Sequence, residues 1–221
     1  GLVGSEMCIR DSYGMVSPGV FMEWLEQDPC IFDLGNWILR TALTDVQKLR
    51  KETEGFFVNV NVAAAQLERR EFRSAVMNIL KETGAKPEEL CLELTERCRD
   101  LDIHFLRGEV EFFHSQGIKI ALDDFGTGFS SLSYLKKLPI NTLKIDKSFT
   151  DTLLTDSATR IITESIVSMV KSLGFESIAE GVEEEQQYKY LRAIGCDIIQ
   201  GYLFGKPLSQ EEIEQLLQKM Y

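Results

Sequence analysis

The sequence predicts an α/β fold in which a parallel sheet is arranged as a barrel. Short apolar runs alternate with helical patterns along the chain, no linker interrupts them, and six runs end in a side chain that could bind a metal or a phosphate. These runs are Phe57 to Asn61, Leu90 to Glu93, Ile118 to Asp123, Thr142 to Lys144, Ser177 to Glu180 and Cys196 to Gln200. A doubly wound sheet is the alternative, but it gathers ligands at one switch point, whereas here nearly every strand has a polar end.

The composition suits one large cytosolic domain. The 221 residues are 44% hydrophobic, so a sizeable core can be buried. A net charge of -11 argues against a nucleic-acid duplex or an anionic membrane as the main partner, although a bound divalent metal would still attract an anionic ligand. The five cysteines are widely spaced without a CxxC pair, which is typical of reduced thiols. We therefore expect a cytoplasmic location, with upstream segments as a possible membrane tether of the parent protein.

The first twelve residues, GLVGSEMCIRDS, show no apolar periodicity. The stretch LVGSEMCIRDS resembles a translated sequencing adapter, so we interpret residues 1–12 as a non-native scar that makes few specific contacts. A natural N-terminal extension is the alternative. The functional domain is then expected to span residues 13–221, with the native gene continuing upstream of Tyr13.

Two helices are expected before the first strand. Ser17 and Pro18 offer an N-cap and a first-position proline for one of them. The second is expected from about residue 36 to 50, with an apolar stripe facing the core. That stripe comprises Trp37, Ile38, Ala42, Leu43 and Val46.

Helical patterns also follow the strands. One carries Phe72, Val76, Ile79 and Leu80, and a glycine or proline ends most of them, at Gly84, Gly117, Pro139, Gly174 and Gly195. The helix at about 102–115 holds His104 and His114 away from the strand ends, so neither is assigned a catalytic role. The helix at 157–172 is expected to bury Ile161, Ile162, Ile166, Met169 and Val170. Ser209 and Glu212 form a capping box for the last helix.

The pair Asp123-Asp124 is the sharpest local feature. It ends a strand and precedes the glycine-rich stretch FGTGFSS. Neighbouring carboxylates repel each other, so both stay ionised readily only beside a cation, and a shared aspartate can bridge two metals. A helix cap or a solvated turn is the structural alternative for this pair.

The other strand ends supply further oxygen ligands and one cation. Glu93 lies between leucines in a strand expected to be buried, where a carboxylate is costly unless it meets a metal or a cation. Asn61 offers a neutral oxygen that suits Mg²⁺ or Mn²⁺. Lys144 should point into a barrel and could orient a water or neutralise a phosphate. Glycines follow Glu180 and Gln200, which permits close backbone approach there.

Taken together, these motifs resemble the EAL family of cyclic-di-GMP phosphodiesterases. The matching strings are MVSPGVF, LGNWIL, VNVNVAAAQL, LELTE, ALDDFGTGFSSLSYL, LKIDKSF, IAEGVE and QGYLFGKPL, from about Tyr13 to Leu208. The resemblance implies a modified (β/α)8 TIM-type barrel that hydrolyses cyclic-di-GMP to the linear dinucleotide pGpG in bacterial second-messenger signalling. It also implies a homodimer formed through the DDFGTGFSS loop and an upstream sensor or diguanylate-cyclase-like domain in the parent.

The resemblance assigns roles to individual residues. Two Mg²⁺ or Mn²⁺ ions would be bound, with Asp123 bridging them. Lys144 would hold the attacking water, Glu180 and Asp124 would act in catalysis, and Glu96 would brace the loop. Gln200, Gly201 and Pro207 would line the substrate site. The metal ligands would be Asn61, Glu93, Asp123, Asp124 and Glu180.

The sequence departs from the family pattern at Ala63, where serine is usual, at Lys206, where arginine is common, and in front of Tyr13. The Glu-Ala-Leu signature and the family's first two strands are absent, so we expect exposed sheet edges at the strands of Asn61 and Gln200, and weak or no hydrolysis by this chain. A non-catalytic cyclic-di-GMP receptor or signalling scaffold is the alternative function. A third hypothesis is a barrel lyase or aldolase with Lys144 as a Schiff-base nucleophile.

Overall fold

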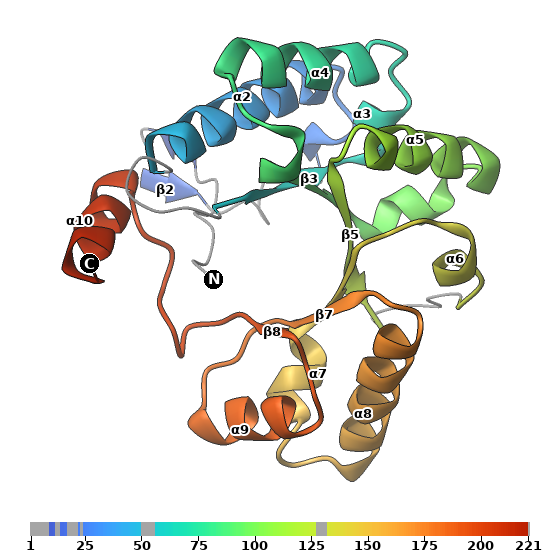
Figure 1. Cartoon of the computed structure of the whole chain (residues 1–221), viewed down its shortest axis with the longest axis vertical. Helices are drawn as coiled ribbons and strands as arrows, with labels where there is room; N and C mark the ends of the chain where they lie inside the picture. Colours follow the sequence, from blue (N-terminus) through green and yellow to red (C-terminus); the bar gives the residue numbers. More distant parts are fainter. Residues whose placement is uncertain are drawn as a thin grey trace.

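A computed structural model describes residues 9–11, 14–16, 22, 24–49, 56–126 and 132–220 (Figure 1). Its centre is a parallel sheet of six strands in the order β3-β4-β5-β6-β7-β8, each pairing with the next one along the chain. The strands are β3 (Val58–Val62), β4 (Leu90–Leu94), β5 (Lys119–Phe125), β6 (Thr142–Ile145), β7 (Glu176–Ala179) and β8 (Ile198–Ile199). All six predicted strands are confirmed.

The two edges of this sheet are β3 and β8. Asn61 lies in β3, and Gln200 follows β8, so the two predicted sheet edges are confirmed among the described residues. The two N-terminal strands β1 (Ile9–Asp11) and β2 (Gly14–Val16) form a separate antiparallel hairpin. The interpretation of residues 1–12 as a scar stays a prediction. The helix expected to begin at Ser17 falls largely outside the described residues.

Helices surround the curved sheet on its outer side (Figure 1). The α-helices are α2 (Ile31–Leu49), α3 (Ala64–Leu67), α4 (Phe72–Thr83), α5 (Ile103–Ser115), α6 (Leu132–Lys137), α7 (Lys147–Thr152), α8 (Ser157–Ser172), α9 (Glu185–Ala193) and α10 (Gln210–Met220). Two 3₁₀ turns, η1 (Pro87–Glu89) and η2 (Glu96–Asp100), flank β4. The sequence did not predict the short helices α3 and α7. The Ser209–Glu212 capping box is confirmed, with Ser209 N donating to Glu212 Oε2 at 2.7 Å.

The main core lies between the sheet and these helices. All five residues of β4 are buried, which is expected of a parallel strand covered on both faces. The four predicted core residues of α4 are all buried, and the Phe72 ring meets the Phe113 ring edge to face at 5.6 Å. Cys91, Cys98 and Cys196 are buried free thiols and Cys30 is an exposed one, while Cys8 lies outside the described residues. No described helix is apolar over a length that could cross a bilayer.

Two predicted core stripes were wrong in part. Trp37 is 56% exposed, Ile161 is 65% exposed and Ile162 is 47% exposed. The buried face of α8 is formed by Thr163, Ile166, Val167 and Val170. At helical spacing Ile161 lies opposite that line and Ile162 lies beside it, and Trp37 likewise lies opposite the buried line of α2. Selecting apolar residues from the sequence alone therefore overestimated the width of the buried face on both α2 and α8.

The corrected face of α8 can be tested with two substitutions of one chemical type. We expect Ile166→Ala to lower the free energy of unfolding by about 2–4 kcal/mol, because it leaves a cavity in the core. Ile161→Ala should change it by less than about 0.5 kcal/mol, because that side chain is mostly in solvent. Urea unfolding of both variants checks this, and equal losses would contradict the observed orientation of α8.

Candidate active site

The carboxyl ends of four neighbouring strands bring charged side chains to one place. Glu93 is in β4, Asp123 in β5 and Lys144 in β6, and Glu180 follows β7 directly. The parallel register aligns these ends, because Leu143 pairs with Ser177 and Ile145 with Ala179. The predicted convergence at the ends of parallel strands is thus observed for these four residues.

Lys144 is the centre of the cluster. Its Nζ atom lies 3.0 Å from Glu93 Oε1, 2.9 Å from Asp123 Oδ1 and 2.8 Å from Glu180 Oε1. The Lys144 side chain is only 6% exposed, so these ion pairs are shielded from water. The predicted inward direction of Lys144 is confirmed.

Asp124 joins the cluster through an irregularity in β5. Its φ is 52°, the one positive value at a non-glycine residue in the described chain, and the β5–β6 register shifts between Leu122 and Phe125. Adjacent residues of a regular strand point to opposite faces, so this bulge lets both aspartates serve one site. Ligand atoms of Asp123, Asp124 and Glu180 all lie within 4.8 Å of one another. Asp124 N also donates to Asp123 Oδ1 at 3.1 Å.

Burial and the neighbouring charges shift the pKa of three groups in the cluster, Glu93, Lys144 and Glu180. Burial raises the pKa of Glu180 to about 7, with a further contribution from the Asp123 charge and an opposing one from Lys144. Burial and the Asp123 charge also raise the pKa of Glu93, against the opposing effect of Lys144 and the Asn59 amide. For Lys144, burial alone would lower the pKa, but the three carboxylates raise it well above its usual value. Lys144 is therefore an ammonium at neutral pH, which argues against a Schiff-base nucleophile.

The donor set fits hard divalent cations. Four carboxylates, those of Glu93, Asp123, Asp124 and Glu180, face one ammonium, which leaves three negative charges if all are ionised. Glu93 Oε1 is buried and, despite its ion-pair distance from Lys144, makes no hydrogen bond of good geometry. A Mg²⁺ or Mn²⁺ ion prefers oxygen ligands of this kind. It would offset the excess negative charge and bind the unsatisfied buried oxygen.

Asn59 affects the charge of Glu93, a role that the sequence did not predict. Its side-chain amide favours the ionised form of Glu93 and so opposes the burial that raises the pKa of that carboxyl. The signal was present, because residues two apart in a strand share a face and the run VNVNV places Asn59 on the side of Asn61. Asn61 itself pairs in register with Glu93 and has an exposed side chain.

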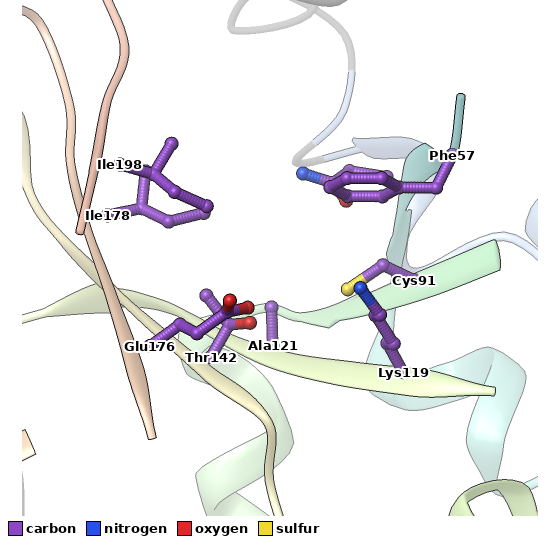
Figure 2. Close-up of a pocket in the computed structure, with 9 residues that line it drawn as sticks. Phe57, Cys91, Lys119, Ala121, Thr142, Glu176, Ile178 and Ile198 are labelled. Carbon is purple, nitrogen blue, oxygen red and sulfur yellow. The ribbon is translucent and has the colours of Figure 1, made fainter. Parts of the chain in front are cut away.

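A small hollow lies on the inner face of the sheet, one layer of side chains closer to the amino ends of the strands. Its lining residues precede the site residues by two positions on several strands, as with Cys91 before Glu93, Ala121 before Asp123 and Thr142 before Lys144. Figure 2 shows the Lys119 amine beside Cys91 on one side, and Ile178 with Ile198 on the other. The inner face therefore changes from mixed apolar character at the hollow to acidic at the strand ends.

The remaining predicted site residues lie in loops. Gln200 follows β8, and its backbone oxygen accepts from Val182 N at 3.0 Å. Pro207 is half-buried ahead of α10, and Glu96 is the first residue of η2. Most of the glycine-rich stretch after Asp124, residues 127–131, lies outside the described residues.

Gly201 allows two loops of the site to touch. A Cβ atom built at Gly201 would lie 2.1 Å from Val182 O and 2.2 Å from Val182 N. Leu203 N also donates to Val182 O at 3.0 Å, so the loop after β8 is joined to the loop that carries Glu180. The predicted close backbone approach at this glycine is observed.

We expect Gly201→Ala to lower the free energy of unfolding by about 1–3 kcal/mol, because the obstructing atoms belong to the backbone and cannot rotate away. Gly205→Ala is the matched control, since a Cβ there meets nothing within 4 Å. Thermal unfolding of both proteins measures the difference. A Gly201→Ala variant as stable as Gly205→Ala would rule out this contact between the loops.

Known proteins with the same architecture identify the domain family. The sequence model of the EAL domain family matches residues 7–207 of this chain. The bifunctional diguanylate cyclase/cyclic di-GMP phosphodiesterase MucR of Pseudomonas aeruginosa is 34% identical over 96% of this chain and 32% of its own length. The cyclic di-GMP phosphodiesterase NbdA of the same organism is 35% identical over 92% of this chain and 26% of its own length. The chain thus spans about a third or less of these curated relatives.

A solved structure agrees with the sequence comparison. The MucR phosphodiesterase in complex with c-di-GMP superposes with a TM-score of 0.91 at 32% identity, covering 96% of this chain and 88% of that one. The described sheet and its covering helices accordingly have the fold of this family. The chain belongs to the EAL domain family.

Proposed function

We propose that this domain hydrolyses one phosphodiester bond of cyclic-di-GMP to give pGpG, and that the reaction depends on divalent metal. The observation that carries the proposal is the buried set of carboxylates at the strand ends, with a single ammonium among them. The phosphodiesterase names of two relatives, MucR and NbdA, and the c-di-GMP complex of MucR support the choice of substrate.

The proposal includes two Mg²⁺ or Mn²⁺ ions bound by this donor set. Asp123 would be the shared ligand, because it lies beside both Asp124 and Glu180. The proposed ligands are Asn61, Glu93, Asp123, Asp124 and Glu180. Bound divalent ions supply positive charge that acidifies water and stabilises phosphoryl oxygens during in-line displacement.

Lys144 and Glu180 are proposed to handle the water that attacks phosphorus. The Lys144 ammonium can hydrogen bond this water and neutralise charge that develops nearby. Glu180, whose Oε1 lies 2.8 Å from Lys144 Nζ, is placed to bind a metal ion or the same water. Asp124, held beside Asp123 by its left-handed backbone, is the third residue that we assign to catalysis.

Residues in the loops are proposed to bind the dinucleotide. Gln200, Gly201 and Pro207 follow the last strand and would line the substrate site, and Glu96 would brace the glycine-rich loop. Homodimerisation through the DDFGTGFSS region, a sensor or diguanylate-cyclase-like domain upstream in the parent, a cytoplasmic location and a functional unit spanning residues 13–221 are further parts of this proposal.

Binding of cyclic-di-GMP without turnover is the second candidate. It is favoured by the position of Asn61, which lies in an edge strand of the described sheet with its side chain exposed. An edge strand is hydrogen bonded to one neighbouring strand only, so a metal-binding side chain such as Asn61 is held less firmly in position for catalysis.

Product analysis separates the two functions. The chain is incubated with cyclic-di-GMP and Mn²⁺ or Mg²⁺, and pGpG is quantified by chromatography beside a chain extended by its native upstream sequence. Formation of pGpG that stops with a chelator supports the hydrolase. Tight cyclic-di-GMP binding by calorimetry with no product from either protein favours the receptor, and neither binding nor product rejects both.

A further inference from the structure

Helix α7 stands close to two loops of the site, the turn after Asp123 and Asp124 and the loop that begins at Glu180. It begins three residues after Lys144, and Asp146 caps it by accepting from Ser148 N at 2.9 Å. This cap fixes the start of α7 relative to β6. The proposed catalysis and cation binding give none of its residues a role, yet two of them contact the two loops and a third is linked to one loop through Gln187 of α9.

The first contact is made by Phe149. Its ring fills the place where a side chain at Gly126 would be, since a Cβ built there lies 2.2 Å from Phe149 Cε2. Gly126 has a φ of 109°, which residues other than glycine rarely adopt. The ring therefore packs on the turn that follows Asp123 and Asp124.

The second contact is made by Lys147. A Cβ built at Gly181 would lie 2.3 Å from Lys147 Cγ, and Gly181 has a φ of 68°. The aliphatic part of Lys147 thus covers the residue that follows Glu180, and its ammonium binds Glu183 Oε1 at 2.8 Å. That ion pair is half-exposed and contributes little by itself, so the packing of the aliphatic part matters more.

A buried hydrogen-bonded link supports the second contact. Gln187 of α9 is 5% exposed, and its Nε2 donates to Thr150 O of α7 at 3.0 Å. Its Oε1 accepts from Glu183 N and Glu184 N, both at 2.9 Å. The loop after Glu180 is therefore attached to α7 at two points.

We propose that α7 is a bracket that holds the Asp123–Asp124 turn and the Glu180 loop at a fixed separation, with Phe149 and Lys147 as positioning residues for cation binding. The inference rests on the proposed metal centre for its consequence, but not for the bracket itself. Without such support the clustered carboxylates would tend to move apart, because like charges repel at close range.

Hydrogen exchange of the metal-free protein tests the bracket directly. In Phe149→Ala, peptides covering 121–126 and 178–184 should both exchange faster. Phe112→Ala is the matched control, because Phe112 is also a partly buried ring packed against the core, but on α5. Faster exchange in only one of the two segments, or the same pattern in the control, would overturn the coupling. Phe149→Leu, which lacks the flat ring, replaces the alanine variant if the latter does not fold.

Mn²⁺ affinity, measured by calorimetry with the ion alone, tests the consequence. Phe149→Ala and Lys147→Ala should each weaken binding about tenfold, as loss of groups that orient metal ligands commonly does. Lys147→Met keeps the aliphatic part and should stay near the unmodified value, as should the exposed control Lys189→Ala. Unchanged affinity in Phe149→Ala would overturn the positioning role. If the unmodified protein bound no Mn²⁺, the proposed metal centre would be wrong, while the exchange pattern would still decide on the bracket.

Discussion

Asp123→Asn is expected to lower the rate of cyclic-di-GMP hydrolysis at least about 10³-fold, because the proposed shared ligand loses its charge and the cations that stabilise the transition state are held less well. The amide is nearly the same size, so packing is preserved. What is lost is a negative charge that lies 2.9 Å from Lys144 and beside Asp124 and Glu180. Stopped assays with Mn²⁺ and chromatographic detection of pGpG measure the effect, in whichever form of the domain shows turnover.

Two controls make this result specific. Asp45→Asn removes an acid that pairs with Lys48 on the surface of α2 and should leave the rate unchanged. Replacing Mn²⁺ by Ca²⁺ should permit substrate binding without turnover, because calcium prefers more ligands and a looser geometry. Turnover by Asp123→Asn within a few-fold of the parent rate would refute the shared-ligand role.

The sequence predicted the sheet and the meeting of its acidic ends because both depend on local signals. Each strand is a short apolar run, and the ends of parallel strands necessarily lie at one edge of a sheet. Glu93, Asp123, Lys144 and Glu180 could therefore be grouped before their distances were known. The helix boundaries at Gly84, Gly117 and Gly174 were equally local, since each of these glycines adopts a positive φ.

What the sequence did not reveal depends on tertiary contacts. The bulge at Asp124 is a shift in register relative to the neighbouring strand β6, so it cannot be recognised from β5 alone. Asn59 can be recognised as a neighbour that affects Glu93 only when β3 is known to pair with β4. Helix α7 has no apolar stripe of useful length, so its six residues gave no periodic signal. The exposed side of α8 similarly depends on how the helix lies on the sheet, which Ile161 and Ile162 do not determine.

Lys144→Met is expected to lower the free energy of unfolding by about 3–5 kcal/mol at pH 8 without metal, the usual cost of leaving a buried charge uncompensated. The substitution keeps most of the side-chain volume but removes the ammonium that lies 2.8–3.0 Å from three carboxylates. Lys189→Met, which removes an exposed ammonium on α9, should leave the unfolding midpoint unchanged.

The loss should depend on pH in a defined direction. Glu180 has its pKa raised by burial to about 7, so its contribution to stability is fully present below its unfolded value near 4.5 and is lost as pH rises through 7. Removing Lys144 takes away an interaction that opposes this rise, so the carboxyls should hold protons to still higher pH. Lys144→Met should therefore be destabilised much less at pH 5 than at pH 8, and added Mn²⁺ should recover part of the loss at pH 8. Urea unfolding at the two pH values provides the measurement, and a loss that is equal at both, or larger at pH 5, would contradict the charge-based account of this cluster.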